Sequence, residues 1–174
     1  MRDDNQLPLT RPVEVERLPQ HGDDIRIEAT ADERAALAKD FNIPAIHELV
    51  GTFFVKGGAK RVRVEGKVTA RVVQTCVVTL EPFESVIEEA VEVNFAQARK
   101  AMSPEEEERR RIDPPDEIVD GKLDLGALTA EFLALGLDPY PKKPGVAFAP
   151  AEEAAAPESP FAALGGLKSD GKDP

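Results

Sequence analysis

The chain has 174 residues, 41% of them hydrophobic, a net charge of −11 and a single cysteine. This length predicts one domain with tails. One cysteine excludes an intrachain disulfide framework and an all-cysteine metal site. The acidic balance argues against wrapping duplex DNA, because general nucleic-acid binders are usually basic. It suits a protein that meets a basic partner such as a ribosomal protein.

The first residues, MRDDNQLPLT, contain no basic region followed by an apolar run. Such a pattern would indicate a secretory signal. No stretch of the chain approaches the roughly 20 apolar residues of a membrane helix. We therefore expect a cytoplasmic protein with no membrane partner.

The first elements are predicted from short local patterns. Residues 1–10 are polar and are expected to be flexible. Alternation over Val13–Leu18 and Ile25–Glu28 predicts a first hairpin. Thr30 and Glu33 have the spacing of a capping box. They predict a helix over residues 31–40 that ends near Asn42, before a proline.

The middle of the chain has the pattern of a β-meander. Ala45–Lys56 predicts a strand, and Gly57-Gly58 predicts a tight hairpin turn. The long alternating stretch from Lys60 follows, and Gly66 predicts a bulge or a sharp bend within it. Phe83–Phe95 predicts the next strand, with glutamates on one face and apolar residues on the other.

The last third predicts two helices and a tail. Residues 103–112, SPEEEERRRI, have a serine cap, early acids and late arginines, which favour a short exposed helix. A turn is expected at Asp120-Gly121, and Asp124 can cap a second helix that ends at Gly136. The apolar stripe of this helix is predicted to contain Leu125, Leu128, Phe132 and Leu135.

These elements predict an α+β fold over residues 11–148. The expected architecture is a strongly bent antiparallel sheet or partial β-barrel, covered by two main helices. Residues 149–174 are rich in Ala, Glu, Pro and Ser and predict a disordered tail. Within this tail, Phe161, Leu164 and Leu167 have the spacing of a short docking motif.

Two longer segments resemble a known family. Residues 68–89, VTARVVQTCVVTLEPFESVIEE, contain a strand, a Cys-x-x-Thr-Leu-Glu-Pro turn and a second strand. Residues 121–145, GKLDLGALTAEFLALGLDPYPKKPG, contain an Asp-Leu-Gly helix and a proline-rich connector. Together they resemble the YceD-like large ribosomal RNA subunit accumulation proteins, a bacterial domain of unknown function. The residues that carry the resemblance are Cys76, Leu80, Glu81, Pro82, Asp124, Leu125 and Gly126.

The resemblance covers about residues 10–148, and RPVEVERLP and DPPDEI fit its alphaproteobacterial members. It implies a role in the accumulation, processing or stability of large-subunit ribosomal RNA, and no catalytic residue. Many members have a second cysteine three positions after the first, where this chain has Thr79. A zinc site built from such cysteines is therefore not expected here, and no other cofactor is expected.

The basic strand has two interpretations. Arg63, Lys67 and Arg71 can lie opposite Glu92, Glu88 and Glu84 in one antiparallel register, which would give weak cross-strand ion pairs. Alternatively, the basic side chains form a patch that contacts RNA phosphates. The patch would consist of Lys56, Lys60, Arg61, Arg63, Lys67 and Arg71. Lys56 and Lys60 flank the expected turn without an obvious acidic partner, and the polar face of this strand carries no aromatic for base stacking.

The other reactive side chains favour structural roles. Cys76 is expected to be a small buried residue at a strand end, and His47 a surface or edge residue. His21, His47 and Cys76 match no metal-ligand spacing. We therefore expect a non-enzymatic factor in large-subunit biogenesis that binds 23S ribosomal RNA or its precursor. The alternative is an acidic protein-interaction module that binds a basic ribosomal protein or assembly factor without touching RNA.

Overall fold

The computed structural model describes residues 8–97 and 115–147. All helices and strands of this part lie within residues 1–144 and form an α+β fold, as predicted. In chain order the elements are β1 (Pro12–Glu14), the 3-10 helix η1 (Val15–Arg17), β2 (Asp23–Glu28), α1 (Ala31–Asp40), β3 (Ala45–Gly58), β4 (Arg61–Thr75), β5 (Pro82–Gln97), β6 (Asp116–Ile118), β7 (Lys122–Asp124) and α3 (Leu125–Gly136).

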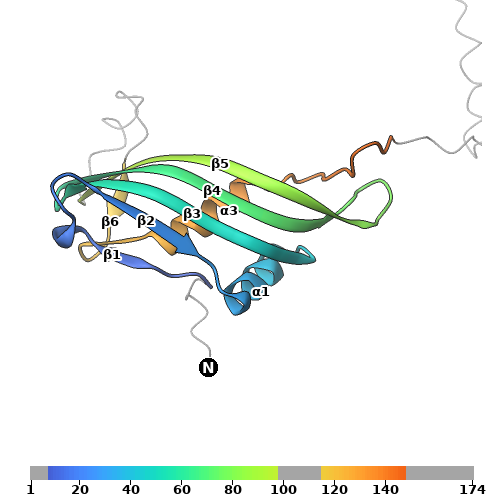
Figure 1. Cartoon of the computed structure of the whole chain (residues 1–174), viewed down its shortest axis with the longest axis horizontal. Helices are drawn as coiled ribbons and strands as arrows, with labels where there is room; N and C mark the ends of the chain where they lie inside the picture. Colours follow the sequence, from blue (N-terminus) through green and yellow to red (C-terminus); the bar gives the residue numbers. More distant parts are fainter. Residues whose placement is uncertain (1–7, 98–114, 148–174) are drawn as a thin grey trace, which may run out of the picture. The chain divides into compact units, whose positions relative to one another are not determined.

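The main sheet has the strand order β2-β3-β4-β5-β6. The first four strands form an antiparallel meander, and its long strands curve together over α3 (Figure 1). The prediction of a purely antiparallel sheet is wrong at β6, which pairs parallel to β5. The sheet has two borders, β2 and β6, so it is open and does not close into a barrel.

The core lies on one face of the meander because apolar residues alternate along its strands. On β4, Val62, Val64, Val68 and Val72 are each at most 2% exposed. Helix α3 contacts β3, β4 and β5 on this face and adds buried leucines to the same core. Neither described helix is long and apolar enough to cross a membrane.

Helix α1 begins and ends where its sequence signals predict. The Thr30 hydroxyl accepts a hydrogen bond from the Glu33 N–H, and the Glu33 carboxylate accepts one from the Thr30 N–H at 2.8 Å. These reciprocal bonds form the capping box. The chain leaves the helix through Asn42, whose φ of 54° lies in the left-handed region.

Helix α3 begins at the predicted cap. Asp124 accepts hydrogen bonds from the N–H groups of Gly126 and Ala127 at 2.9 and 3.0 Å. The predicted apolar stripe is wrong at one residue: Leu135 is 69% exposed, and Leu133 is buried instead. The sheet curves over several helix positions at once, so the buried surface is wider than a single row of leucines.

The predicted first hairpin does not form. Strand β1 pairs antiparallel with β7, which places Val13 opposite Leu123 in a separate two-stranded sheet, and β2 pairs with β3. The 3-10 helix after β1 explains the difference, because it turns the chain away before β2 begins. The Val15 N–H donates to the Gly121 carbonyl at 3.0 Å, in the predicted Asp-Gly turn.

Two predictions about glycines are also wrong in detail. Gly58 pairs with Arg61, so the hairpin turn consists of Ala59 and Lys60 rather than the two glycines. Gly66 pairs regularly on both sides and forms no bulge. A Cβ at Gly66 would lie 2.0 Å from the Thr52 carbonyl oxygen, so the glycine permits a close backbone approach.

The irregularity of the meander lies instead in β3. The register between β3 and β4 shifts between Ile46 and Glu48, at His47. The helix predicted over residues 103–112 and the tail with its docking motif lie outside the described residues. The predictions of a flexible start and of the domain limits at residues 11 and 148 remain predictions.

Candidate nucleic-acid interface

The outer face of the main sheet carries the basic residues predicted from β4. Because the buried valines of β4 (Val62, Val64, Val68 and Val72) point into the core, the intervening side chains point to solvent. The residues on this face of β4 include Arg61, Arg63, Lys67 and Arg71. Lys56 joins them from β3, since it lies directly opposite Arg63, while Lys60 lies in the turn between the two strands.

The predicted register with β5 is wrong by two residues. Arg63 lies opposite Asn94, Lys67 opposite Ala90 and Arg71 opposite Val86. The faces are nevertheless as predicted, because a shift of two residues returns every side chain to the same side of the sheet. The connection after β4 sets this register: the Cys76 N–H bonds the Glu81 carbonyl, so the ladder starts at Thr75 and Pro82.

Arg63 has a structural role on this face. Glu65 and Glu92 lie directly opposite one another, which would be unfavourable for two uncompensated carboxylates. One guanidinium nitrogen of Arg63 lies 2.5 Å from Glu65 and 2.8 Å from Glu92. The cation therefore compensates both acids, so the ion-pair interpretation describes Arg63 well.

Arg71 also has an acidic neighbour, although a different one from that predicted. It lies 4.0 Å from Glu48 on β3, and Glu84 instead lies 3.4 Å from the exposed ring of His47. Among the described residues, Lys67 forms no ion pair. On the central part of this face, Arg63 and Arg71 therefore both lie beside acidic side chains.

The end of the face at the β3–β4 turn is different. Among residues 8–97 and 115–147, no acid forms an ion pair with Lys56, Lys60 or Arg61. Arg61 lies beside Gly58, which has no side chain to cover it. We call Lys56, Lys60 and Arg61 the cationic corner. Lys56 and Arg61 border a hollow of about 450 Å³ that also includes Arg63, Asn94 and Pro115.

An aromatic ring that we did not anticipate lies next to this corner. Phe54 is 37% exposed and lies on the outer face of β3, opposite Glu65. Its neighbours Phe53 and Val55 are buried, and alternation along a strand therefore predicts that Phe54 faces outward. The basic strand itself carries no aromatic residue, as expected, and the ring comes from the neighbouring strand β3.

The cysteine turn and the proline-rich connector, the two motifs of the family resemblance, lie together. The Val77 N–H donates to the Pro141 carbonyl at 2.9 Å, and the Lys143 N–H donates to the Cys76 sulfur at 3.4 Å. The Lys143 Nζ lies 3.2 Å from Glu81. Leu80 takes a φ of 60°, which lets the turn close before Pro82 begins β5.

Cys76 is buried, as predicted. Its pKa is lowered to about 6, chiefly because the backbone N–H groups of Lys143 and Thr79 favour the thiolate. The Thr79 hydroxyl acts in the same direction, while burial opposes it. Within the described chain, backbone amides and a hydroxyl surround this sulfur, and none of them is a base that could activate a nucleophile.

The Asp-Leu-Gly motif holds the start of the described chain. Asp124 accepts a hydrogen bond from the Arg11 N–H at 2.7 Å, and the Leu125 N–H donates to the Arg11 carbonyl at 3.1 Å. A Cβ at Gly126 would lie 2.7 Å from the Arg11 nitrogen, so the absence of a side chain at Gly126 leaves room for the backbone at Arg11. The motif therefore has a structural explanation.

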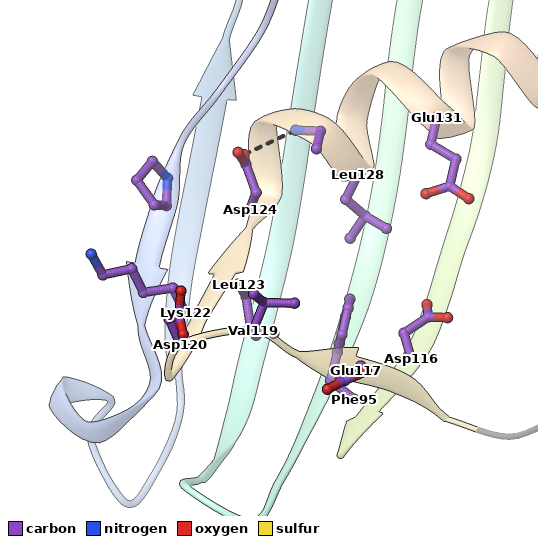
Figure 2. Close-up of a pocket in the computed structure, with 12 residues that line it drawn as sticks. Phe95, Asp116, Glu117, Val119, Asp120, Lys122, Leu123, Asp124, Leu128 and Glu131 are labelled. Atoms are coloured by element: carbon purple, nitrogen blue, oxygen red, sulfur yellow. Dashed lines mark hydrogen bonds between the residues drawn. The ribbon is translucent and has the colours of Figure 1, made fainter. Parts of the chain in front are cut away.

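A hollow of about 510 Å³ lies between β6, β7 and the first turns of α3. Figure 2 shows Glu131 and Asp116 pointing toward one another there, with Asp120, Lys122 and the capping Asp124 along the other side. Within the described residues, no group of three or more histidine, cysteine or acidic side chains is arranged to hold a metal. Acidic side chains thus predominate among the charged residues that line the hollow.

Fold and surface define a small α+β protein with a curved open sheet and a charged outer face. The family model "Large ribosomal RNA subunit accumulation protein YceD" matches residues 64–168, more than half of the chain. The chain therefore belongs to this family, whose name links it to the accumulation of large-subunit ribosomal RNA. No curated protein and no solved structure gives a significant match.

The match begins within β4 and includes both the cysteine turn and the Asp-Leu-Gly helix. Family membership was predicted from these two segments and is confirmed. The resemblance of residues 10–63, and the alphaproteobacterial type, remain predictions.

Proposed function

We propose that this protein supports the synthesis, processing or stability of 23S ribosomal RNA by binding the RNA or its precursor. It acts in the cytoplasm as a binding factor rather than an enzyme. The observation that carries the proposal is the cationic corner: Lys56, Lys60 and Arg61 gather at one turn without acidic partners within the described chain, although the whole chain has a net charge of −11.

A cationic corner of this kind suits phosphate contact. Lysine and arginine side chains at a turn extend away from the sheet, and phosphate oxygens are acceptors for both. Asn94 adds an exposed amide beside Arg63. The chain as a whole has a net charge of −11, so among the described residues we expect the RNA to contact this corner first.

Phe54 supplies a second kind of contact. It lies opposite Glu65, two residues before Lys56 on the same face of β3. Unpaired bases stack on aromatic rings, and single-stranded loops of RNA can present such bases. We therefore expect a preference for single-stranded or looped RNA over a regular duplex.

The test is equilibrium binding of purified protein to 23S ribosomal RNA precursor over a series of salt concentrations. The variant Lys56→Glu/Lys60→Glu/Arg61→Glu is compared with Arg17→Glu/Lys39→Glu/Lys122→Glu, which changes the net charge equally at exposed positions elsewhere. Each phosphate contact contributes about 0.7 to 0.9 to the slope of log affinity against log salt. The corner variant should lose about 2 units of that slope and bind at least tenfold more weakly.

The control variant separates a local surface from overall charge. If both variants lose affinity equally, net charge alone governs binding and the cationic corner is not the interface. If the unmodified protein does not bind RNA at low salt, the proposal is wrong. The alternative of a protein-interaction module for a basic ribosomal protein or assembly factor then takes its place.

A further inference from the structure

Strand β5 has one border that is largely open. On one side it pairs with β4 along its whole length. On the other side it pairs with β6 only at Phe95, Ala96 and Gln97. Among residues 8–97 and 115–147, no strand pairs with this border over residues 82–94. An open strand border is a template on which another extended chain can add.

The register shows which backbone groups face outward. The Gln97 N–H donates to the Lys60 carbonyl at 3.2 Å, so Gln97 is a hydrogen-bonded position of the ladder with β4. Hydrogen-bonded positions alternate along an antiparallel pair. Odd-numbered residues of β5 therefore bond β4. The outward-facing positions along the open border are Glu84, Val86, Glu88, Ala90, Glu92 and Asn94.

The side chains at these positions define the chemistry of the border. All six lie on the outer face and are exposed, and every second one is a glutamate: Glu84, Glu88 and Glu92. Val86 is 68% exposed between two of the acids. An extended chain that adds here would meet alternating negative and small or apolar neighbours on its outer face.

This pattern selects among possible occupants. A second copy of the chain would bring a second row of β5 glutamates alongside these, and closely spaced like charges across a strand pair are destabilising. An extended segment with lysine or arginine at alternate positions would instead place cations beside the acids. Backbone hydrogen bonds would supply affinity, and the alternating charges would set the register of the added strand.

We propose that the open border of β5 binds a basic extended segment of a partner protein by β-strand addition. The border from Glu84 to Asn94 has room for about ten residues, or roughly 35 Å of extended chain. The border shares Asn94 with the hollow beside the cationic corner, but it contains none of Lys56, Lys60 and Arg61, so the inference does not depend on RNA binding.

The test measures binding of the full-length protein to a synthetic nine-residue peptide. In this peptide lysine alternates with threonine and valine. Fluorescence anisotropy of the labelled peptide should show saturable binding. N-methylation of one alternate set of peptide nitrogens removes the donors that face β5, and should weaken binding at least tenfold. Methylation of the other set should have little effect. Equal effects of both sets, or no binding at low salt, would overturn the proposal.

Two protein variants locate the site. Ala90→Pro removes only an outward N–H and should weaken binding about tenfold, with an unchanged circular dichroism spectrum as the folding check. Glu84→Gln/Glu88→Gln should weaken it about three- to tenfold, whereas Glu16→Gln/Glu131→Gln, exposed acids elsewhere, should not. Unchanged affinity in Ala90→Pro, or a dimer in sedimentation that this variant abolishes, would contradict a basic partner segment at this border.

Discussion

At the scale of single residues, Arg11 and Glu33 form the most complete ion pair of the described chain. Two nitrogens of the guanidinium lie 2.7 and 3.0 Å from the two carboxylate oxygens. The same carboxylate accepts the Thr30 N–H of the capping box. Arg11 lies beside the α3 cap, so this pair connects the beginnings of both helices.

The pair predicts a pH-dependent contribution to stability. The hydrogen bonds from Arg11 lower the pKa of Glu33 to about 2. Because the folded-state pKa lies below the unfolded value, the contribution is complete above about pH 5 and is lost as pH falls toward 2. We expect Glu33→Gln, which keeps a capping oxygen, to lower the free energy of unfolding by about 1 kcal/mol at pH 7.

Urea denaturation at a series of pH values checks this prediction. The difference between the unmodified protein and Glu33→Gln should shrink on acidification. A difference that stays constant from pH 7 to pH 3 would show that packing, and not the ion pair, is responsible. Glu16→Gln, which changes an exposed acid, is the control and should be close to neutral.

Gly66 gives a second residue-scale prediction. Its hydrogen atom faces the Thr52 carbonyl, where a methyl group would overlap the backbone. We expect Gly66→Ala to lower the free energy of unfolding by about 1–3 kcal/mol. Gly58→Ala is the matched control, because nothing lies within 4 Å of its Cβ position. Equal thermal shifts for both variants would contradict this explanation.

At the scale of elements, sequence patterns predicted the long strands and both described helices. Alternation identifies a strand and its buried face, and a capping residue marks where a helix begins. Neither identifies the partner strand. The register of β5 depends on how the six residues from Cys76 to Glu81 close, and the site of β1 depends on β7, far away in sequence.

The candidate site was predictable to a similar extent. The faces of Lys67 and Arg71 follow from alternation, but their neighbours follow from the register. The lack of ion pairs at the corner cations, within residues 8–97 and 115–147, and the exposure of Phe54 are properties of the assembled sheet. Local sequence carries no information on which strand borders remain open, so the border of β5 was not foreseen.

The contact between the cysteine turn and the connector gives an element-scale prediction. Cys76 is fully buried, and it is the only cysteine of the chain, so thiol labelling reports on this contact alone. We expect iodoacetamide to modify the folded protein at least 100-fold more slowly than the unfolded protein at pH 8, because reagent access requires local opening.

The variant Lys143→Pro tests the cause of this protection. It removes the N–H that donates to the sulfur. Labelling should become faster, because the connector is held less firmly. Lys142→Pro serves as a neighbouring control. Fast labelling of the unmodified protein would contradict the burial of the thiol.

At the scale of the whole molecule, charge is separated into two surfaces. Within the part of the chain that the structure describes, cations without an ion pair lie at the β3–β4 turn, and acids follow the open border of β5. We expect the corner variant, with glutamate at residues 56, 60 and 61, to bind the basic peptide with unchanged affinity. Conversely, Ala90→Pro should bind RNA normally. Loss of both activities in either variant would show that the two surfaces act as one.

The pairing of β1 with β7 has a consequence for synthesis on the ribosome. The meander from β2 to β5 joins neighbouring segments and can assemble as soon as they emerge. Strand β1 must wait until Leu123 has been made, and Val13 lacks its cross-strand neighbour until then. A nascent chain therefore carries an unfinished first segment for most of its translation. Pulse-labelling hydrogen exchange should show protection in β3 and β4 before β1.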